Sequence, residues 1–281
     1  MKRSTFVQRF LLLLVICMSL LFLSCGTVPI TGRRQLSLIP SYQLQSMSFQ
    51  SYGEFLSKHK IGGSVEQTKA VQRVGRRIQR AVENYFASRN MTNQLSGYQW
   101  EFNLIESPDA NAWCMPGGKV VVYTGILPVA GDEAGLATVL AHEIAHAVAD
   151  HGNERMSHAL LAELGSTALS EALAERPEET RKWFATAYGL GAQVGLVLPF
   201  SRLHELEADR LGLVFMAMAG YDPRAAVGFW QRMAQSKKNP RLTDFLSTHP
   251  SDSKRISAIE AAIPEALSYY KGQAKPNQFY Q

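Results

Sequence analysis

The stretch VLAHEIAHAVADHG, residues 139–152, places two histidines and a glutamate in an otherwise apolar run. His142 and His146 are four residues apart, so on a helix their rings lie on one face, one turn apart. Two imidazole nitrogens placed in this way can both reach one Zn²⁺ ion at about 2.0–2.1 Å. Glu143 lies about 100° around the helix from His142, where it can reach a water on the metal but cannot join both histidines as a ligand. This pattern is typical of zinc metalloproteases in which the glutamate is the general base. The alternative is a pair of core histidines bonded to backbone groups.

A catalytic zinc needs three protein ligands and an open fourth position, and the stretch SRLHELEADRLG, residues 201–212, offers the third ligand. Glu205 and Asp209 are again four residues apart, so they share one helix face. Glu205 is predicted to bind the zinc. Asp209 is predicted to accept the free ring N–H of a ligating histidine, which fixes the tautomer of that ring. Glu207 and His204 are weaker candidates. Without the upstream motif, a charged helix surface would be the simpler interpretation.

The combination of HEIAH at 142–146 and E-x-x-A-D at 205–209 resembles the membrane-associated zinc metalloproteases typified by HtpX and the CAAX prenyl protease. Four stretches look like the bacterial lipoprotein branch of that family, related to LoiP: VPITGRRQLSLIP, NAWCMPGGKVVVYTGIL, LPFSRLHELEADRLG and LSTHPSDSKRI. The resemblance covers residues 28–262, and it implies a gluzincin-type fold and an endopeptidase that acts on envelope proteins. It also implies the roles in the site: His142, His146 and Glu205 as ligands, Glu143 as base and Asp209 as supporting carboxylate.

The expected fold class is α+β, mainly α: a gluzincin-type zinc metalloprotease domain with a small antiparallel sheet. YQWEFNLIE (98–106) alternates apolar and polar residues, which predicts a strand. NAWCMPGGKVVVYTG (111–125) is typical of two strands joined by a turn. In the helix that carries the two histidines, Asp132 is the expected N-cap and Gly152 the expected stop. Helical periodicity predicts helices that start near Tyr42 and that cover 65–88, 132–150, 153–174, 201–219, 222–237 and 251–262.

The first residues, MKRSTFVQRFLLLLVICMSLLFLSCGT, place basic side chains before an apolar run from Phe10 to Leu23. As a helix that run is about 21 Å long, short of the ~30 Å hydrocarbon core of a bilayer, which favours an export signal over a spanning anchor. FLSCGT resembles a bacterial lipobox, so Cys25 is predicted to carry lipid. An uncleaved anchor and cleavage by an ordinary signal peptidase are the alternatives.

Four segments are therefore expected: a lipoprotein signal peptide (1–24), a lipidated tether (25–40), one zinc metallopeptidase domain (41–270) and a loose tail (271–281). The protein is predicted to lie in the bacterial cell envelope, facing the periplasm. Gly26, instead of an aspartate, after the cysteine favours the outer membrane over the inner one. Integral-membrane members of the family carry several spanning helices. This sequence shows none of adequate length, so lipid alone would hold the protein at the membrane.

The net charge and the cysteine content limit the kinds of partner and cross-link that we expect. The leader supplies three of the net charges of +5, and the remaining +2 gives no reason to expect a nucleic-acid partner. Cys114 is the only cysteine outside the leader and the lipid site, so no disulfide is expected. It could be a fourth zinc ligand, but a small buried apolar residue is the favoured interpretation.

Four arginines of helix 65–88 are most simply interpreted as a solvated helix face, and binding to an anionic lipid surface is the alternative. They are Arg73, Arg76, Arg77 and Arg80.

Three residues outside the ligand set are candidates for roles near the metal. His249, in STHPSD, is the first candidate for a donor to the tetrahedral oxyanion. It could instead occupy the open zinc position and hold the enzyme latent, or cap a loop before Pro250. Arg210 is a weaker donor candidate. His151 lies one residue past a full turn from His146 and is expected to be a capping or surface residue.

Strand 119–124, which follows a Pro-Gly-Gly turn, is predicted to be a sheet edge to which an extended polypeptide substrate adds as a further strand. This mode of binding favours unfolded or loop segments. The apolar stretch 183–200 is most simply a buried helix, with a lid or a lipid contact as alternatives. The predicted substrate-binding residues are Asn111, Gly117, Gly118 and Val120.

The sequence therefore predicts a zinc-dependent endopeptidase, with one Zn²⁺ per chain, that hydrolyses unfolded or misassembled proteins of the bacterial envelope. Two alternatives remain open. One is an envelope chaperone or assembly factor whose zinc site is latent or structural. The other is a zinc hydrolase that acts on small amides or esters instead of peptides.

Overall fold

The computed structural model describes residues 25–164, 202–236 and 239–272. The predicted signal peptide, the stretch 183–200 and nearly all of the predicted tail lie outside these ranges. The strands are β1 (Cys25–Thr27), β2 (Arg34–Leu36), β3 (Glu101–Ile105), β4 (Ala112–Met115) and β5 (Lys119–Tyr123). The helices are α2 (Ser41–Lys58), α3 (Val65–Ser88), α4 (Leu127–Ala130), α5 (Glu133–Val148), α6 (His151–Leu164), α9 (Arg202–Met218), α10 (Ala225–Gln235), α11 (Thr243–Thr248) and α12 (Ser253–Leu267). The predicted class, α+β and mainly α, is confirmed.

A three-stranded sheet lies at the centre of the fold, in the order β3-β5-β4. The predicted hairpin is present: β4 and β5 are antiparallel and are joined by a turn in which Gly117 and Gly118 both have φ of +82°. The expectation of a wholly antiparallel sheet is wrong, because β3 pairs in parallel with β5. Alternation along a strand shows which side chains are buried, but it does not encode which strand becomes the neighbour.

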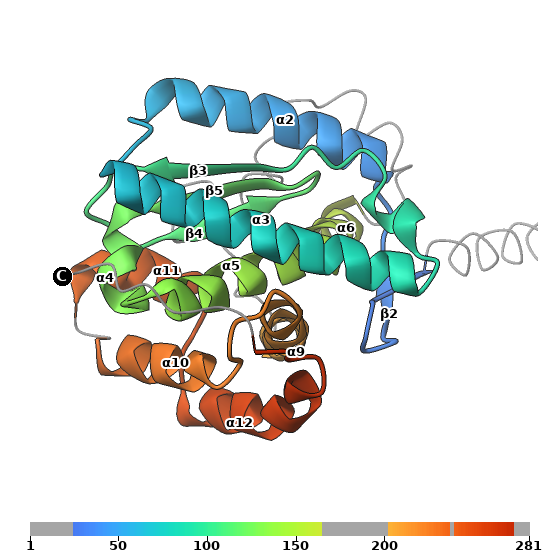
Figure 1. The fold of residues 1–281 in the computed structure, drawn as a ribbon. Helices are drawn as coiled ribbons and strands as arrows, with labels where there is room; N and C mark the ends of the chain where they lie inside the picture. The colour runs from blue at the N-terminus through green and yellow to red at the C-terminus, as the bar shows by residue number, and fades with distance from the viewer. Residues whose placement is uncertain (1–24, 165–201, 237–238, 273–281) are drawn as a thin grey trace, which may run out of the picture.

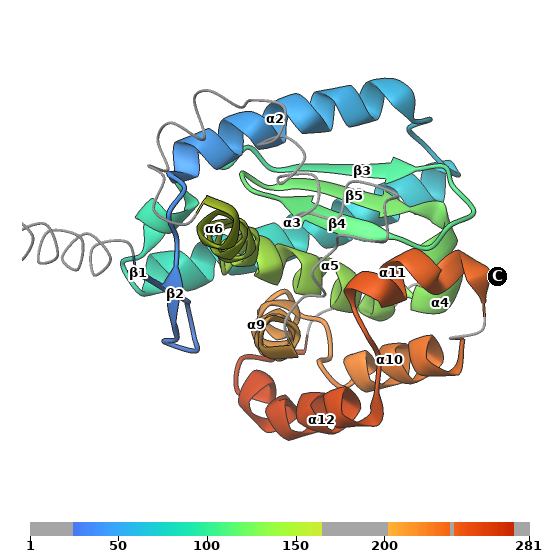
Figure 2. The ribbon, with the colours of Figure 1, turned by 180° about the vertical axis from the view of Figure 1, so that it is seen from behind.

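Two layers of helices cover the sheet (Figure 1). Along β5, Val120 and Val122 face the main core, which α3 and α5 build, while Val121 faces a smaller core under α2 and α6. Helices α9, α10 and α12 lie on the side of α5 away from the sheet, and Figure 2 shows α5 between the two groups. The zinc-motif helix is therefore enclosed on both sides. Among the described residues, no helix is both long and apolar enough to cross a bilayer.

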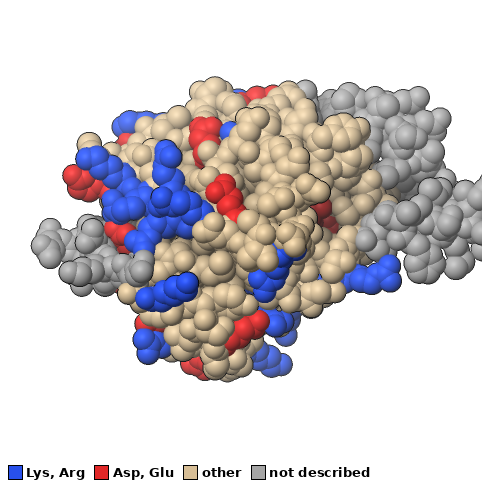
Figure 3. Space-filling view, turned by 45° about the vertical axis from the view of Figure 1, so that its right-hand side comes forward, with Lys and Arg blue, Asp and Glu red and all other residues tan. Residues whose placement is uncertain are grey.

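Helix α3 matches its predicted bounds. Ser64 caps it, since its hydroxyl accepts from the Gln67 N–H at 3.2 Å while the Gln67 side chain accepts from the Ser64 N–H at 3.1 Å. Arg73, Arg76 and Arg80 are exposed on the helix, and Arg73 also pairs with buried Glu133. Lys and Arg side chains gather in one patch of the molecular face drawn in Figure 3. These three positions are consistent with a solvated basic face, whereas Arg77 is half-buried and donates to the Ala219 carbonyl at 3.1 Å.

Two predicted helix ends are wrong. Gly152 was expected to stop α5, but α6 starts at His151, directly after Asp150. Asp150 has φ of +57° and so takes the left-handed conformation that a glycine was expected to supply. At the other end of the chain, α12 continues through Pro264 to Leu267, one turn beyond the predicted end near residue 262.

We expect Asp150→Asn to stabilise the protein at pH 7. The Asp150 carboxylate accepts from Asn153 at 2.9 Å and from Ser37 at 3.2 Å, yet burial raises its pKa to about 6. A carboxyl whose folded pKa lies above its unfolded value destabilises the fold when ionised, and this penalty disappears as the pH falls from about 6 to about 4. Asparagine keeps one acceptor oxygen and tolerates positive φ.

Urea unfolding should show a gain of about 1–2 kcal/mol for Asp150→Asn at pH 7, less than the full pKa shift implies because the residue is partly exposed. Near pH 4 the gain should vanish. An equal gain at both pH values would contradict the assignment of the effect to the buried charge.

A glycine lets α9 approach α5 closely enough for their side chains to share one site. A Cβ added at Gly212 would lie 3.1 Å from the His142 backbone nitrogen and 3.2 Å from the Ala141 carbonyl carbon. Both are backbone atoms of a helix that is packed on two sides, so they cannot easily move away.

We therefore expect Gly212→Ala to lower the free energy of unfolding by about 1–2 kcal/mol, measured by thermal or urea unfolding. Gly228→Ala in α10 is the matched control, because its added Cβ meets only the flexible end of Arg232 at 3.3 Å. The control should be neutral or stabilising through helix propensity. Equal effects of the two substitutions would mean that helix packing at Gly212 is not the cause.

Candidate functional site

Four buried side chains meet where α5, α9 and the residue after α11 come together. His142 and His146 come from α5, Glu205 from the first turn of α9, and His249 from the position that ends α11. One ligand atom from each can be chosen so that all four lie within 4.8 Å of one another. Among the described residues this is the group of histidine, cysteine and acidic side chains that could hold a metal ion.

The distances within this cluster fit a zinc ion. Four ligands placed tetrahedrally at about 2.0–2.1 Å from a metal are about 3.3 Å from one another. The Nε2 atom of His142 lies 3.1 Å from His146 Nε2 and 3.1 Å from His249 Nδ1. The Glu205 carboxylate lies 3.4 Å from His142, 3.2 Å from His146 and 3.1 Å from His249. The types of ligand atom and their spacing therefore match a zinc site. The two α5 histidines turn ring nitrogens towards the other ligand atoms, so they are not simply core residues bonded to backbone groups.

The outer partner of His142 is the residue that the sequence suggested for this position. Asp209 Oδ1 lies 2.9 Å from His142 Nδ1, on the side of the ring away from the cluster. Burial alone would raise the pKa of Asp209, but Arg255 and His142 outweigh it and hold this pKa below its usual range. The carboxylate is thus ionised and can accept the ring N–H, which leaves Nε2 free for a metal.

Arg255, in the first turn of α12, was not singled out from the sequence. Its guanidinium donates to Asp209 at 2.7 and 2.8 Å, lies 2.8 Å from Glu205 and stacks 3.5 Å above the Trp230 ring. Against the cost of burial, His249 and Arg255 hold the pKa of Glu205 well below its usual range. The sequence signal for this role of Arg255 is weak. Asp252 predicts the start of a helix, but a basic residue three positions after an N-cap usually faces solvent.

The outer partner of His146 is His151, so its prediction as a capping or surface residue is wrong. The ring of His151 is fully buried, with Nδ1 at 2.8 Å from His146 Nδ1 and Nε2 at 3.1 Å from Glu207. Burial holds the pKa of both histidines well below the usual value, so both rings are neutral. The i+5 spacing does not predict this contact, because α5 ends before α6 begins. The bend at Asp150 turns the His151 ring back towards His146.

Glu143 lies beside the cluster without belonging to it. It is buried, its Oε1 atom accepts no hydrogen bond from the described residues, and that atom lies 3.4 Å from His249 Nε2. Burial raises its pKa above the usual value. A carboxylate with a free oxygen and a raised pKa beside a metal site has the properties of a general base.

The favoured interpretations of Cys114 and Arg210 agree with the structure. The Cys114 thiol is buried and is not in the cluster, and burial raises its pKa well above the usual value. It is therefore a buried apolar residue, as favoured. Arg210 pairs with Glu265 of α12 at 2.7 and 3.0 Å, as expected of the weaker donor candidate.

The predicted docking edge is wrong. Strand β5, which carries Val120, has strands on both sides, so its main chain has no free edge for a substrate. Gly117 and Gly118 form the turn and pack against the rings of Phe49 and Trp100. Asn111 precedes β4, an edge strand, and its side chain accepts from the Ala112 N–H at 2.9 Å. The prediction of an edge failed because β5 comes last along the chain but not in the sheet, where β3 pairs with it on the side away from β4.

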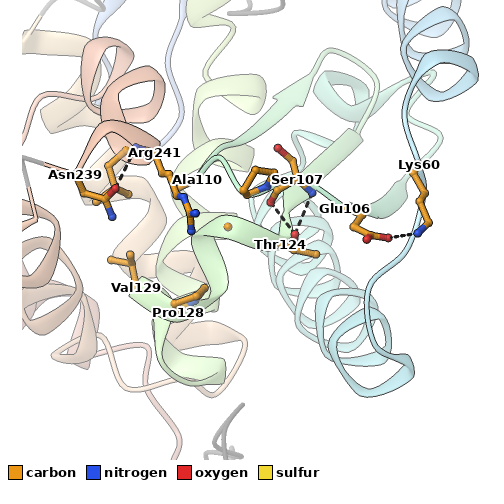
Figure 4. A pocket seen from close by; sticks show the side chains of 12 residues that line it. Lys60, Glu106, Ser107, Ala110, Thr124, Pro128, Val129, Asn239 and Arg241 are labelled. Atoms are coloured by element: carbon orange, nitrogen blue, oxygen red, sulfur yellow. Dashed lines mark hydrogen bonds and ion pairs between the residues drawn. The ribbon is translucent and has the colours of Figure 1, made fainter.

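A cavity of about 500 Å³ opens apart from the cluster, between the loop after β3 and the short 3₁₀ helix η3 (Pro240–Leu242) (Figure 4). Lys60 and Glu106 form an ion pair at its rim, and Arg241 faces it from η3. Ala110, just before β4, also lines it, so the cavity lies at the start of that edge strand.

Comparisons with known proteins agree with this geometry. A family described as "Peptidase family M48" matches residues 72–263. The mitochondrial metalloendopeptidase OMA1 of Schizosaccharomyces pombe is 36% identical over 85% of this chain and 66% of its own length. Human OMA1 is 32% identical over 85% of this chain and 46% of its own length. A beta-barrel assembly-enhancing protease of Yersinia pestis is 31% identical over 56% of this chain and 33% of its own length. The chain thus spans about one third to two thirds of the length of these relatives.

These relatives correct the predicted location. The relatives that match most of the chain are mitochondrial, whereas the bacterial assembly-enhancing proteases match just over half of it. The predicted location in the bacterial outer membrane is therefore contradicted, and the narrower resemblance to a lipoprotein branch is not supported. The predicted location depended on residues 1–26, and a pattern of basic residues before an apolar run is too general to determine the cellular compartment. Lipidation of Cys25 stays an untested prediction.

Proposed function

The chain belongs to peptidase family M48, and on that premise we propose that it is a zinc-dependent endopeptidase that hydrolyses peptide bonds in extended or unfolded segments of other proteins. The observation that carries this proposal is the buried set of His142, His146, Glu205 and His249, spaced as ligands of one zinc ion. Glu143 lies beside the set with a free carboxylate oxygen. One zinc ion per chain is expected.

The chain's own residues supply the proton transfers and the electrostatics. His142, His146 and Glu205 would hold the metal, which when bound polarises a carbonyl and lowers the pKa of a water. Glu143 takes the proton of the attacking water and passes it to the leaving nitrogen. Asp209 keeps His142 in the tautomer that ligates. Arg255 offsets the negative charge of the two buried carboxylates, Asp209 and Glu205.

We propose that the substrate adds as a strand to β4. The Tyr123 N–H donates to the Asn111 carbonyl at 2.9 Å, and Asn111, Trp113 and Met115 face β5 in this register. In an antiparallel pair the intervening residues turn their main-chain groups outward. Cys114 therefore turns its main-chain groups away from β5, to the side on which the described residues place no further strand, whereas the Ala112 N–H is already bound by the Asn111 side chain. Strand β4 also packs against α5, which carries the motif. This mode requires an extended backbone, so compact substrates are excluded.

His249 is expected to limit activity, because its Nδ1 atom completes a four-ligand set and a catalytic site needs an open position. We expect His249→Ala to cleave casein severalfold faster than the wild type while zinc stays bound. The measurement is the initial rate at matched zinc content. A loss of about 100-fold would instead identify His249 as an oxyanion donor.

The same closed ligand set favours one second candidate, a chaperone or assembly factor with a latent or structural zinc site. The decisive experiment is zinc analysis of the purified protein together with casein cleavage, 1,10-phenanthroline inhibition and recovery with added zinc. One zinc per chain with reversible cleavage supports the endopeptidase. Bound zinc without cleavage by wild type or His249→Ala, together with suppressed aggregation of an unfolded protein, would favour the chaperone. A protein that binds no zinc would overturn both.

A further inference from the structure

The segment 25–40, predicted as an extended tether, is folded onto the domain. Strands β1 and β2 pair in antiparallel fashion and enclose a loop in which Val28 is buried. Strand β2 contacts α6, and Figure 2 shows the two side by side. Two side chains of this hairpin, Thr31 and Arg33, point inward to the carboxylates of α6 and α9.

Arg33 joins the two helices. Its terminal nitrogens donate to both oxygens of Glu154 on α6 at 2.8 and 2.7 Å, and its Nε donates to Glu207 on α9 at 2.8 Å. Thr31 donates to the other oxygen of Glu207. The Arg33 Nε–H and the Thr31 hydroxyl thus donate to the two oxygens of Glu207, and Glu207 is the acceptor of this group.

The contacts of Glu207 continue to the metal cluster. Glu207 accepts from His151 Nε2 at 3.1 Å, and His151 Nδ1 lies 2.8 Å from His146 Nδ1. Because His146 turns Nε2 to the cluster, its proton must be on Nδ1, and His151 Nδ1 must accept it. The proton of His151 is then on Nε2 and is donated to Glu207. Stacking of the His204 ring on His151, at 4.3 Å between centroids, holds this ring in orientation.

The two ligating histidines are supported in parallel ways. Behind His142 stand Asp209 and then Arg255 of α12. Behind His146 stand His151, then Glu207, and then Arg33 of the hairpin. Each row ends in a carboxylate held by an arginine. The second row is longer by one imidazole, and its arginine comes from a segment far from the motif in sequence.

We propose that the N-terminal hairpin is part of the metal centre: Arg33 and Thr31 fix Glu207, Glu207 fixes His151, and His151 positions the ligand His146. All four are positioning residues, since none reaches the metal or the substrate. This inference rests on the proposed function, because it requires zinc to bind at His142, His146 and Glu205.

The test is the zinc affinity of the full chain, measured by competition with a chromophoric chelator at pH 7. We expect Arg33→Met and His151→Phe to weaken zinc binding about 10- to 100-fold, the usual effect of removing an outer partner of a ligand. His151→Asn should lose less, because its side-chain oxygen can still accept from His146. Arg34→Met, at the exposed next residue where β2 begins, is the matched control and should stay within about twofold of the wild type.

The unfolding temperature of each zinc-free variant separates positioning from simple loss of stability. If Arg33→Met and the control bind zinc equally well, the proposal is overturned, whatever their stabilities. If His151→Phe does not fold, the comparison of Arg33→Met and His151→Asn with the control decides. A wild type that binds no zinc would instead refute the proposed function, so the two failures can be told apart.

Discussion

Replacing Glu143 by glutamine is expected to slow peptide hydrolysis by about 10²–10⁴-fold and to leave zinc binding unchanged. Glu143 is buried beside the four-ligand set and its Oε1 atom accepts no hydrogen bond from the described residues, so it is free to take a proton. Glutamine has nearly the same shape but cannot accept that proton at the carboxylate. The change also removes a buried charge, so the fold should be as stable as before or slightly more stable.

The measurement is the casein cleavage rate, with zinc content and the unfolding temperature determined on the same preparation. Glu260→Gln, an exposed change of the same chemistry on α12, is the control and should be as active as the wild type. If Glu143→Gln cleaved casein at more than about one tenth of the wild-type rate, another group would have to be the base. If it lost zinc, Glu143 would have a role in the ligand set that its position does not suggest.

The local part of the site could be predicted from sequence. His142 and His146 share a helix face because of the helical period, and the same spacing places Asp209 one turn beyond Glu205. Asp132 accepts from the Gly135 N–H at 2.8 Å, which is the predicted N-cap. These features depend on residues a few positions apart, where backbone geometry alone fixes the relation.

The parts that failed depend on contacts between distant segments. The strand order makes β5, which carries Val120, the central strand, and nothing in its run of valines distinguishes a central strand from an edge in so small a sheet. Arg33 and Arg255 lie 121 and 46 positions from the acids Glu154 and Asp209 that they hold. A surface arginine and a buried one look alike in sequence. The difference is set by which carboxylates the fold brings to them.

Arg255→Met is expected to lower the free energy of unfolding by about 3–5 kcal/mol, because it leaves buried carboxylates without their counter-charge. Arg255 is only 4% exposed, and Asp209 and Glu205 are 6% and 4% exposed. The loss should be larger in zinc-free protein than in zinc-loaded protein, since a bound cation would offset the charge of Glu205. Methionine fills much of the volume above Trp230, so the effect reports the charge more than a cavity.

Urea unfolding of the zinc-free and zinc-loaded forms measures this difference. Arg210→Met is the control: its pair with Glu265 is equally short, but both side chains are more than one third exposed. Exposed pairs contribute about 0–1 kcal/mol, so the control should lose no more than that. Arg255→Lys should fall between the two, because an ammonium restores the charge but not the two parallel bonds to Asp209. A loss for Arg255→Met no larger than that of the control would mean that the buried acids are protonated instead of paired, contrary to their lowered pKa values.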